Sequence, residues 1–202
     1  MRADLDIVSG LVPRGSRVLD LGCGDGALLE HLIHDHGCHG YGVEISHEGV
    51  HACIARGVPV VEADIDAGLA DVDDDSFDVV ILSQTLQATH RPTVVIDEMM
   101  RVGREGIVSF PNFAHWPLRV QLAVRGRMPK SRLLPYEWYD TPNIHLCTVG
   151  DFEDLVRHRG LRVARRIVLG PDGRQASPRA ERRANLLAAG VVYVLHRARD
   201  EG

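Results

Sequence analysis

A glycine-rich loop with a carboxylate directly before it is the first feature of the sequence that could do chemistry. Asp20 is followed by glycines at three alternate positions, Gly22, Gly24 and Gly26, between an apolar run and a helical pattern. Glycine lets a backbone turn tightly and approach a ligand, and the N-terminus of the following helix offers free N–H groups that suit a carboxylate. The Asp20 side chain is placed to meet a cation. S-adenosylmethionine carries an ammonium, a sulfonium and a carboxylate, so the loop predicts a site for it or for S-adenosylhomocysteine.

Two other interpretations of this loop stay open. Gly22, Gly24 and Ala27 also fit the spacing of a dinucleotide fingerprint, and a glycine turn can be purely structural. A dinucleotide loop brings the backbone close to a pyrophosphate, whereas the Asp20 carboxylate suits a cationic ligand better. The acidic residue therefore favours S-adenosylmethionine over a dinucleotide.

Acidic residues also end the next two predicted strands. Glu44 lies twenty residues after Gly24, where a carboxylate can accept hydrogen bonds from both hydroxyls of a ribose. Asp64 would accept a hydrogen bond from the adenine amino group, with Ile65 as an apolar contact beside it. The alternatives are that Glu44 caps the following helix and that Asp64 is an ordinary strand-end aspartate. The predicted cofactor contacts are Asp20, Gly22, Gly24, Gly26, Glu44, Ile45, Asp64, Ile65 and Ser83.

A neutral polar segment, residues 83–87, follows the most β-like stretch of the chain, where a transferred methyl group would meet its acceptor. Its amides and hydroxyls can orient a substrate but do not readily take a proton, which disfavours methylation of an amino-nucleobase. A general base would have to be a histidine, whose ordinary pKa of about 6.5 suits the work, although each histidine can equally be structural. The catalytic candidates are Gln87, His90 and His145, and the expected substrate or partner contacts are Asn112, His115, Tyr136 and Trp138.

Composition argues against several other functions. The formal net charge of −5 gives no overall positive field, so binding of nucleic acid through its phosphates is not expected. Four clustered histidines, at positions 31, 34, 36 and 39, have no indicated set of Cys or carboxylate partners for zinc, and no metal is predicted. No apolar run approaches the roughly 18 residues of a membrane span, and the four cysteines form no C-x-x-C pair. We therefore expect a cytoplasmic protein that binds neither nucleic acid nor membrane.

These residues require a scaffold of alternating strands and helices. Strands are predicted at 17–21, 40–45, 59–64, 77–83, 106–110, 161–169 and 187–196, and helices at 3–12, 27–36, 47–56, 93–101 and 152–159. This alternation predicts a parallel sheet with helices on both faces, and the last two strands are expected to form an antiparallel hairpin around the polar segment 171–185. The expected fold is therefore α/β, a Rossmann-like class I methyltransferase fold with a seven-stranded, mostly parallel sheet, in a single domain over residues 1–202.

Residues 112–146 stand apart as an insertion that could hold a substrate or a partner. Five basic residues occur in it with no acidic residue between them: Arg119, Arg125, Arg127, Lys130 and Arg132. The aromatic-rich stretch 133–139 follows directly. A basic run is often a solvated face, but next to aromatic residues it can also hold an anionic ligand or a protein. Both interpretations stay open.

Four segments together resemble one family. They are VLDLGCGDG (18–26), LSQTLQ (82–87), FPNF (110–113) and YDTPNIH (139–145), and they resemble the MetW family of methionine biosynthesis proteins from about Leu5 to Leu195. The glycine loop is common to class I methyltransferases, whereas the later three segments and GRMP (126–129) are particular to this family. The segment 171–185 is longer and more basic than the family pattern.

The resemblance implies a protein of the methionine pathway that is linked with a homoserine O-acyltransferase, whose activity or assembly it supports. It implies Asp20, Gly22, Gly24 and Glu44 as cofactor contacts, but neither a methyl acceptor nor a catalytic base. Two hypotheses follow. The protein is an accessory subunit that senses S-adenosylmethionine or serves as a scaffold, or it is an active methyltransferase with a small-molecule substrate. A homodimer is left open.

Overall fold

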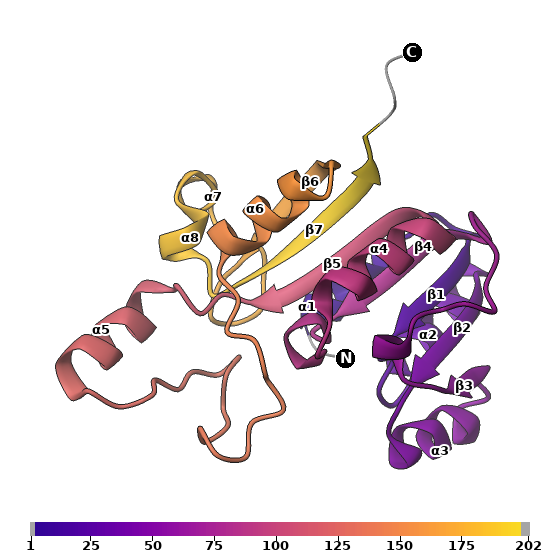
Figure 1. Ribbon diagram of the computed structural model, residues 1–202, viewed down its shortest axis with the longest axis horizontal. Helices are drawn as coiled ribbons and strands as arrows, with labels where there is room; N and C mark the ends of the chain where they lie inside the picture. The colour runs from indigo at the N-terminus through magenta and orange to yellow at the C-terminus, as the bar shows by residue number, and fades with distance from the viewer. Residues whose placement is uncertain (1–2, 199–202) are drawn as a thin grey trace.

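A single sheet forms the centre of the protein. The structure is a computed structural model that describes residues 3–198, and within this range seven strands form one sheet in the order β3-β2-β1-β4-β5-β7-β6 (Figure 1). The strands are β1 (Arg17–Leu21), β2 (His39–Glu44), β3 (Val60–Glu62), β4 (Phe77–Ser83), β5 (Gly103–Pro111), β6 (Leu161–Leu169) and β7 (Gly190–Arg197). The first five pair in parallel, and β7 runs antiparallel to both β5 and β6. The predicted mostly parallel sheet with an antiparallel C-terminal hairpin is confirmed.

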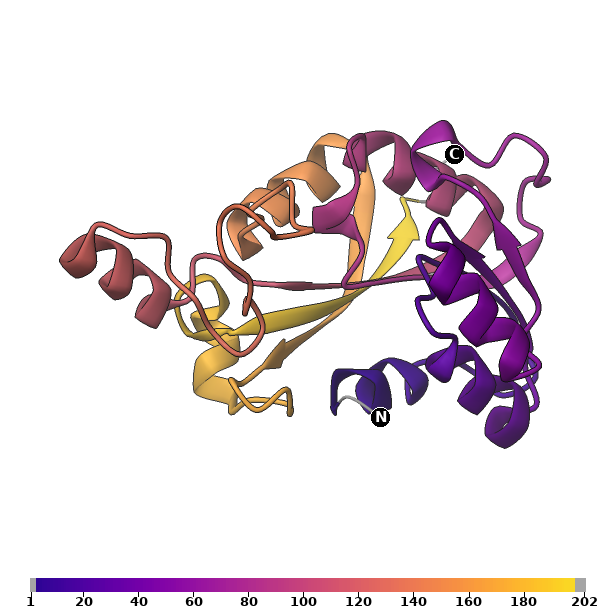
Figure 2. The same cartoon turned by 90° about the horizontal axis from the view of Figure 1, so that it is seen from below.

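Helices cover both faces of the sheet, as predicted (Figures 1 and 2). They are α1 (Ala3–Ser9), α2 (Ala27–His36), α3 (His47–Ala55), α4 (Pro92–Val102), α5 (Trp116–Arg125), α6 (Val149–His158), α7 (Pro178–Arg182) and α8 (Ala184–Leu187), with short 3₁₀ turns η1 (Ile65–Ala67) and η2 (Leu86–Ala88). Successive strand residues point to opposite faces, so Val80 and Leu82 pack in one cluster with α4 and α6, while Val79 and Ile81 pack in another with α1 and α2. Within residues 3–198, none of the helices has the length and apolar composition that a membrane crossing needs.

Several elements differ from the sequence prediction. No helix is predicted within 112–146, yet α5 forms there, with a proline in its first turn and Gly126 at its end in a left-handed conformation, φ 60°. The segment 171–185 is not simply a loop, because α7 forms in it and α8 begins there. Leu187 belongs to α8, so the last strand begins at Gly190. The predicted first helix ends at Ser9, and the third strand is limited to Val60–Glu62.

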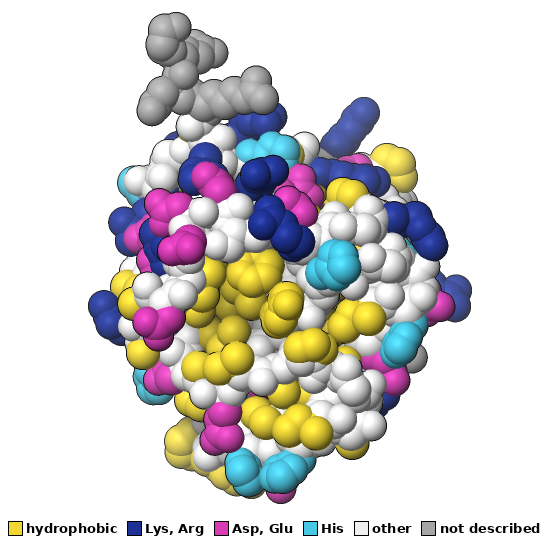
Figure 3. Space-filling model, turned by 90° about the vertical axis from the view of Figure 1, so that its right-hand side faces the viewer, with side chains coloured by type: hydrophobic (Ala, Val, Ile, Leu, Met, Phe, Trp, Pro, Cys, Tyr) yellow, Lys and Arg dark blue, Asp and Glu magenta, His cyan; other side chains and the backbone are white. Residues whose placement is uncertain are grey.

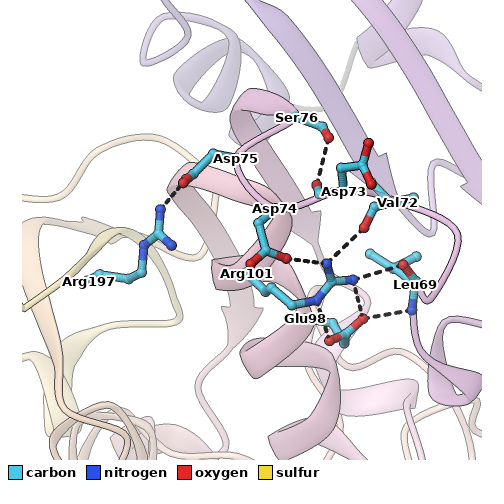
Figure 4. A network of polar contacts seen from close by, with 9 residues as sticks. All are labelled: Leu69, Val72, Asp73, Asp74, Asp75, Ser76, Glu98, Arg101 and Arg197. Atoms are coloured by element: carbon cyan, nitrogen blue, oxygen red, sulfur yellow. Dashed lines mark hydrogen bonds and ion pairs between the residues drawn. The ribbon is translucent and has the colours of Figure 1, made fainter.

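A polar network holds the connection between η1 and β4 against α4 (Figure 4). The Arg101 guanidinium donates to the Glu98 carboxylate at 2.9 and 2.8 Å and to the backbone carbonyl groups of Leu69 and Val72 at 2.9 and 2.8 Å. It also donates to Asp74 at 2.6 Å. Chiefly because of the hydrogen bonds from Arg101, the pKa of Glu98 is lowered to about 2. This network fixes the segment that connects η1 to β4 against α4.

Candidate cofactor cleft

The predicted cofactor residues meet at the carboxyl ends of the parallel strands. The strand order reverses at β1, which has β2 on one side and β4 on the other, and open α/β sheets bind their ligands at such a switch point. The glycine loop joins β1 to α2 there. Two pockets lie along this edge and share Gly22, Gln84 and Thr85 in their walls. We call the two pockets together the cleft.

The larger pocket of the cleft, about 710 Å³, is formed by the glycine loop and the residues that follow β4. Of the predicted contacts it is lined by Asp20, Gly22, Gly24 and Ser83. Gly26 lines neither pocket. It precedes α2 with a φ of 76°, and a Cβ there would lie 2.8 Å from the Cys53 Sγ of α3. Its role in the structure is therefore to bring α2 and α3 close together.

The smaller pocket, about 380 Å³, is lined by the remaining predicted contacts Glu44, Ile45, Asp64 and Ile65. Asp64 precedes η1, and its Oδ1 accepts a hydrogen bond of 2.9 Å from the backbone N–H of Asp66. The Asp66 carboxylate accepts in turn from the backbone N–H groups of His90 at 2.8 Å and Arg91 at 2.7 Å. Asp66 therefore ties this wall of the cleft to the start of α4, a role that the sequence analysis does not assign to it.

Glu44 is buried and joins the glycine loop to the start of α3. Its Oε2 accepts from the backbone N–H of Gly24 at 2.8 Å, and its Oε1 accepts from that of Ser46, also at 2.8 Å. The N-cap of α3 is Ser46, whose Oγ accepts from the backbone N–H of Gly49 at 3.4 Å. Capping of α3 thus belongs to Ser46, and Glu44 presents a carboxylate whose position is set by two backbone amides.

Gly49 lines neither pocket but packs against two residues of the cleft, and its role is not predicted from the sequence. A Cβ at this position would lie 2.8 Å from Glu44 Cγ and 2.9 Å from the Gly24 carbonyl oxygen, so only glycine lets α3 approach both. One feature of the sequence could have indicated this role. A glycine inside a predicted helix lowers the stability of the helix, so its presence suggests that a larger side chain would not fit there.

Gln84 is a second residue that only the structure singles out. It has a φ of 60°, which is rare for a residue other than glycine, and it lines both pockets. Its side-chain Nε2 is buried and has no hydrogen-bond partner among residues 3–198. Beside it, Thr85 packs so closely on Gly22 that a Cβ on the glycine would lie 2.5 Å from Thr85 Cγ2. Neither the left-handed conformation of Gln84 nor this close packing can be predicted from the residue types alone.

The cleft is rich in carboxylates. Asp20 and Asp25 line the larger pocket, and Glu44, Asp64 and Asp66 line the smaller one. The basic side chain in the larger pocket, Arg56, is paired with Asp25 at 2.9 Å and with Glu30 at 2.8 Å. Such a lining favours a ligand that carries positive charge and hydroxyl donors over a pyrophosphate.

The cysteine of the glycine loop is packed inside the protein. Cys23 Sγ lies 3.6 Å from Cys53 Sγ, and both side chains are buried. Burial, followed by the nearby Asp20 carboxylate, raises the pKa of the Cys23 thiol well above its ordinary value. The thiol therefore stays protonated and serves as a small packing group.

The catalytic candidates do not converge on one point. His90 lines the smaller pocket. Gln87 is buried, and its Nε2 donates to the Gln84 carbonyl at 2.6 Å, so its side chain braces the turn after β4. His145 is exposed, and neither Gln87 nor His145 lines the cleft.

The expected substrate or partner contacts also separate. Asn112 is fully buried: its Nδ2 donates to the Ala188 carbonyl at 2.8 Å, and its Oδ1 accepts from Ala114 N–H at 3.1 Å. His115 is buried, and this burial lowers its pKa, so it stays neutral at pH 7. Tyr136 and Trp138 instead line a separate pocket between α5 and the segment after it. Asn112 therefore serves the fold, whereas Tyr136 and Trp138 belong to an outer surface.

The histidine cluster has its own local contacts. His31 Nδ1 lies 2.6 Å from Asp35 Oδ2, one helical turn away in α2, and the His31 and His36 rings are 5.2 Å apart. Within residues 3–198, no group of three or more His, Cys, Asp or Glu side chains is arranged to hold a metal ion.

The chain matches one family of known proteins over almost its whole length. The family model described as methionine biosynthesis protein MetW matches residues 2–195. A curated relative, the bifunctional methionine biosynthesis protein MetXA/MetW of Rhodopirellula baltica, is 36% identical over 207 residues, which cover 98% of this chain. The match covers 33% of the relative, so this chain spans about one third of that protein's length.

Solved structures resemble the whole chain. A methyltransferase from Mesorhizobium loti, described as S-adenosylmethionine dependent, has a TM-score of 0.70 at 19% identity, covering 96% of this chain and 98% of its own. A second such enzyme, from Thermotoga maritima and described as a possible histamine N-methyltransferase, has a TM-score of 0.67 at 19% identity, with 97% and 88% covered. At this identity the likeness concerns the fold, which is that of S-adenosylmethionine-dependent methyltransferases.

Proposed function

Because the chain belongs to the MetW family of methionine biosynthesis proteins, we propose that it is an S-adenosylmethionine-binding accessory protein that supports a homoserine O-acyltransferase. The observation that carries this proposal is the Rhodopirellula baltica relative, whose name assigns MetXA and MetW to one bifunctional chain. We take its MetXA part to be the acyltransferase. Two functions joined in one polypeptide act at a high effective concentration of each other, which suits an enzyme and its accessory protein.

The proposed ligand fits the chemistry of the cleft. The loop from Gly22 to Gly26 and the N-terminus of α2 would hold the methionyl carboxylate, and the Asp20 carboxylate would face the ammonium. The Glu44 carboxylate would accept from the ribose hydroxyls, while Asp64, Ile45 and Ile65 would surround the adenine. The residues that line the cleft support this fit, because the glycine loop lies beside several carboxylates.

The ligand would then act as a signal. In this proposal the whole chain is one ligand-binding domain, and residues 112–146 are its partner-binding insertion. S-adenosylmethionine is formed from methionine, so an accessory protein that binds it can report the supply of methionine to an early step of the pathway. A fold shared with methyltransferases does not by itself imply methyl transfer.

The test combines the purified chain with its cognate acyltransferase. Size-exclusion chromatography with light scattering measures the complex, and acyl transfer is followed with and without the chain, each at zero and saturating S-adenosylmethionine. We expect a stable complex and a change in the acylation rate that depends on the chain. Two separate elution peaks together with an unchanged rate would overturn the proposal.

A methyltransferase acting on a small metabolite is the second candidate. The observation that favours it is the polar wall of the larger pocket, formed by Ser83, Gln84 and Thr85. Incubation with methyl-labelled S-adenosylmethionine and a small-molecule extract tests it, because an active enzyme would yield a labelled metabolite. Absence of labelled product, at a concentration of chain that binds the labelled nucleoside, would eliminate this candidate.

A further inference from the structure

Residues 116–146, which we call the arm, extend away from the sheet. The arm contains α5 and the irregular segment that returns from it to α6, and Figures 1 and 2 show α5 at the far end of the molecule, well away from the strands. Beyond Leu118 most residues of α5 are exposed. A helix that presents nearly all of its surface to solvent in this way lacks the packing that normally stabilises a short helix.

Exposed apolar side chains are concentrated on the arm. Of the sixteen large hydrophobic residues exposed among those that the structure describes, ten lie on it: Trp116, Val120, Leu122, Val124, Met128, Tyr136, Trp138, Tyr139, Ile144 and Leu146. Both tryptophans of the chain are included, and Val124 and Trp138 are 79% and 73% exposed. Trp, Tyr, Met and Arg are the residue types that dominate protein interfaces and their energetic centres.

The charge of the arm is opposite to that of the whole protein. It carries Arg119, Arg125, Arg127, Lys130 and Arg132 against two acidic residues, Glu137 and Asp140, in a chain with a net charge of −5. Lys130 is paired with Glu137. A groove of about 1120 Å³ lies between the end of α5 and the returning segment, lined among others by Arg125, Arg127, Tyr136 and Trp138. Apolar surface and free positive charge therefore occur together.

The shape of the arm is held by its own hydrogen bonds. Gln121 of α5 exchanges two hydrogen bonds of 3.3 Å with the backbone of Lys130, which closes the turn after the helix. Arg119 donates to the carbonyl oxygens of Ala114 at 2.5 Å and Asn185 at 3.3 Å, which anchors α5 to the body. A surface ordered before binding loses less conformational entropy when a partner docks.

We propose that the arm is the docking surface for the partner protein, and that the partner contributes an apolar groove rimmed by carboxylates. This inference rests on the proposed function, because the partner meant is the homoserine O-acyltransferase. The aromatic side chains would enter the groove, and Arg125 and Arg127 would face the acidic rim, which would speed and orient association.

Two other occupants are disfavoured, one by the charge of the arm and the other by the comparison with the related chain. A second copy of the chain docked arm to arm in a two-fold symmetric dimer would bring the five basic residues of each arm close together, and the resulting repulsion disfavours it. An anionic membrane would also attract a basic amphipathic helix, but the related bifunctional chain joins MetW to a protein.

A second apolar area lies at the opposite end of the sheet. Figure 3 shows hydrophobic side chains gathered on the face that carries the β3 edge, and exposed residues of β2, α3 and β3 include Tyr41, Ile54 and Val61. None of the elements there has a run of basic residues like that of the arm. This area supplies the matched control for the arm.

The experiment measures binding of the purified cognate acyltransferase to the wild-type chain and to three variants. Trp138→Ala and the double variant Arg125→Glu/Arg127→Glu alter exposed side chains of the arm, and Ile54→Ala alters a side chain that is 61% exposed on α3. We expect Trp138→Ala to weaken binding by more than about 30-fold, the range of an interface hot spot. The charge reversal should slow association and abolish its dependence on salt. Ile54→Ala should bind like the wild type.

The possible results distinguish failure of the docking surface from failure of the proposed function. If the wild-type chain does not bind the acyltransferase, the proposed function and the docking surface both fail. If it binds but tolerates the arm variants, while Ile54→Ala weakens the complex, the proposed function stands and the arm is not the interface. Light scattering of the chain alone and sedimentation with vesicles of anionic phospholipid complete the test. If the wild-type chain self-associates or binds vesicles and the arm variants abolish that binding, the arm docks a second copy of the chain or a membrane, and the proposed partner is wrong. Unchanged S-adenosylmethionine affinity and circular dichroism establish that each variant is folded.

Discussion

The backbone carbonyl of Gln87 accepts a hydrogen bond of 2.7 Å from the backbone N–H of Ile144. Gln87 lies in η2, which begins three residues after the end of β4, and Ile144 lies near the end of the arm. The neighbouring N–H of His145 donates to the same carbonyl at 2.9 Å. Just before these two residues, Pro142 and Asn143 form part of the wall of the smaller pocket of the cleft. The end of the arm is thus bonded to the turn that follows β4 and also borders the cleft.

A ligand in the cleft should therefore slow hydrogen exchange at the end of the arm. Contacts of S-adenosylmethionine with Pro142 and Asn143 would stabilise the hydrogen bonds of Ile144 and His145, because opening this segment would also break contacts with the ligand. Hydrogen-exchange mass spectrometry, with and without the ligand, measures the peptide covering 139–146. The β6–β7 hairpin is the internal control and should not change. Slower exchange in the glycine loop alone would contradict a connection between cleft and arm.

Replacing Glu44 by Gln should weaken binding of S-adenosylmethionine and of S-adenosylhomocysteine by about tenfold or more. A hydrogen bond to a charged group contributes about 1.5–3 kcal/mol, and the amide also exchanges one of the acceptors held by Gly24 and Ser46 for a donor. Isothermal titration calorimetry measures both affinities. Glu48→Gln, at an exposed position of α3, is the matched control and should bind like the wild type. Equal affinities for Glu44→Gln and Glu48→Gln would remove Glu44 from the proposed site.

Gly49→Ala should lower both stability and ligand affinity, although alanine is the better helix former. Its Cβ would push against Glu44 Cγ at 2.8 Å and the Gly24 carbonyl at 2.9 Å, and crowding of this kind costs about 1–3 kcal/mol. Gly150→Ala in α6 is the control, because the nearest atom to its Cβ would be 3.6 Å away. That variant should be neutral or more stable by up to about 1 kcal/mol. Thermal unfolding and calorimetry compare the two, and an equal response of both would show that Gly49 is not a packing constraint.

The free energy of unfolding should fall in acid, partly because Glu98 becomes protonated and loses its ion pair with Arg101. Its pKa is about 2 in the folded protein against 4.5 in the reference state, so the unfolded chain binds the proton first as the pH falls. The stabilisation is fully present above about pH 5.5, declines through the range between the two pKa values and is gone below about pH 1. Glu98→Gln should remove about 1–2 kcal/mol of this pH dependence once solvent screening is included. Urea unfolding at pH 6 and pH 3 tests it, with Glu48→Gln as control. A variant with the wild-type pH slope would refute the assignment.

The alternation of strands and helices and the position of the cleft followed from local patterns in the sequence. Short apolar runs such as 77–83 predict buried strands, and a glycine loop between a strand and a helix occurs where such sheets bind ligands. Eight of the nine predicted cofactor contacts line the cleft, and Gly26 packs against Cys53 of α3 instead. The family resemblance, which is confirmed, rested on segments that include residues 139–145 at the end of the arm.

Other features depended on contacts between residues far apart in the chain. The apolar residues of α5 alternate along the chain at positions 118, 120, 122 and 124, which is not the spacing that predicts a helix, and all of these except Leu118 are exposed. The importance of Gly49 comes from Glu44 and Gly24, which belong to other elements. Gln84 adopts a left-handed conformation just after β4. Glutamine has no preference for this conformation, so it could not be predicted from the residue type.

By itself the sequence determined the class of fold, the family and the edge of the sheet where a ligand would bind. These depend on periodicity and on short motifs, whose physical causes act within one element and its nearest neighbours along the chain. Only the tertiary structure decided that Asn112 is a buried brace, that Gln87 ties the arm to the turn after β4, and that the aromatic residues of the arm are exposed and do not line the cleft. The reason is that burial and hydrogen-bond partners are properties of the packed chain, in which residues such as Gln87 and Ile144 meet across more than fifty positions.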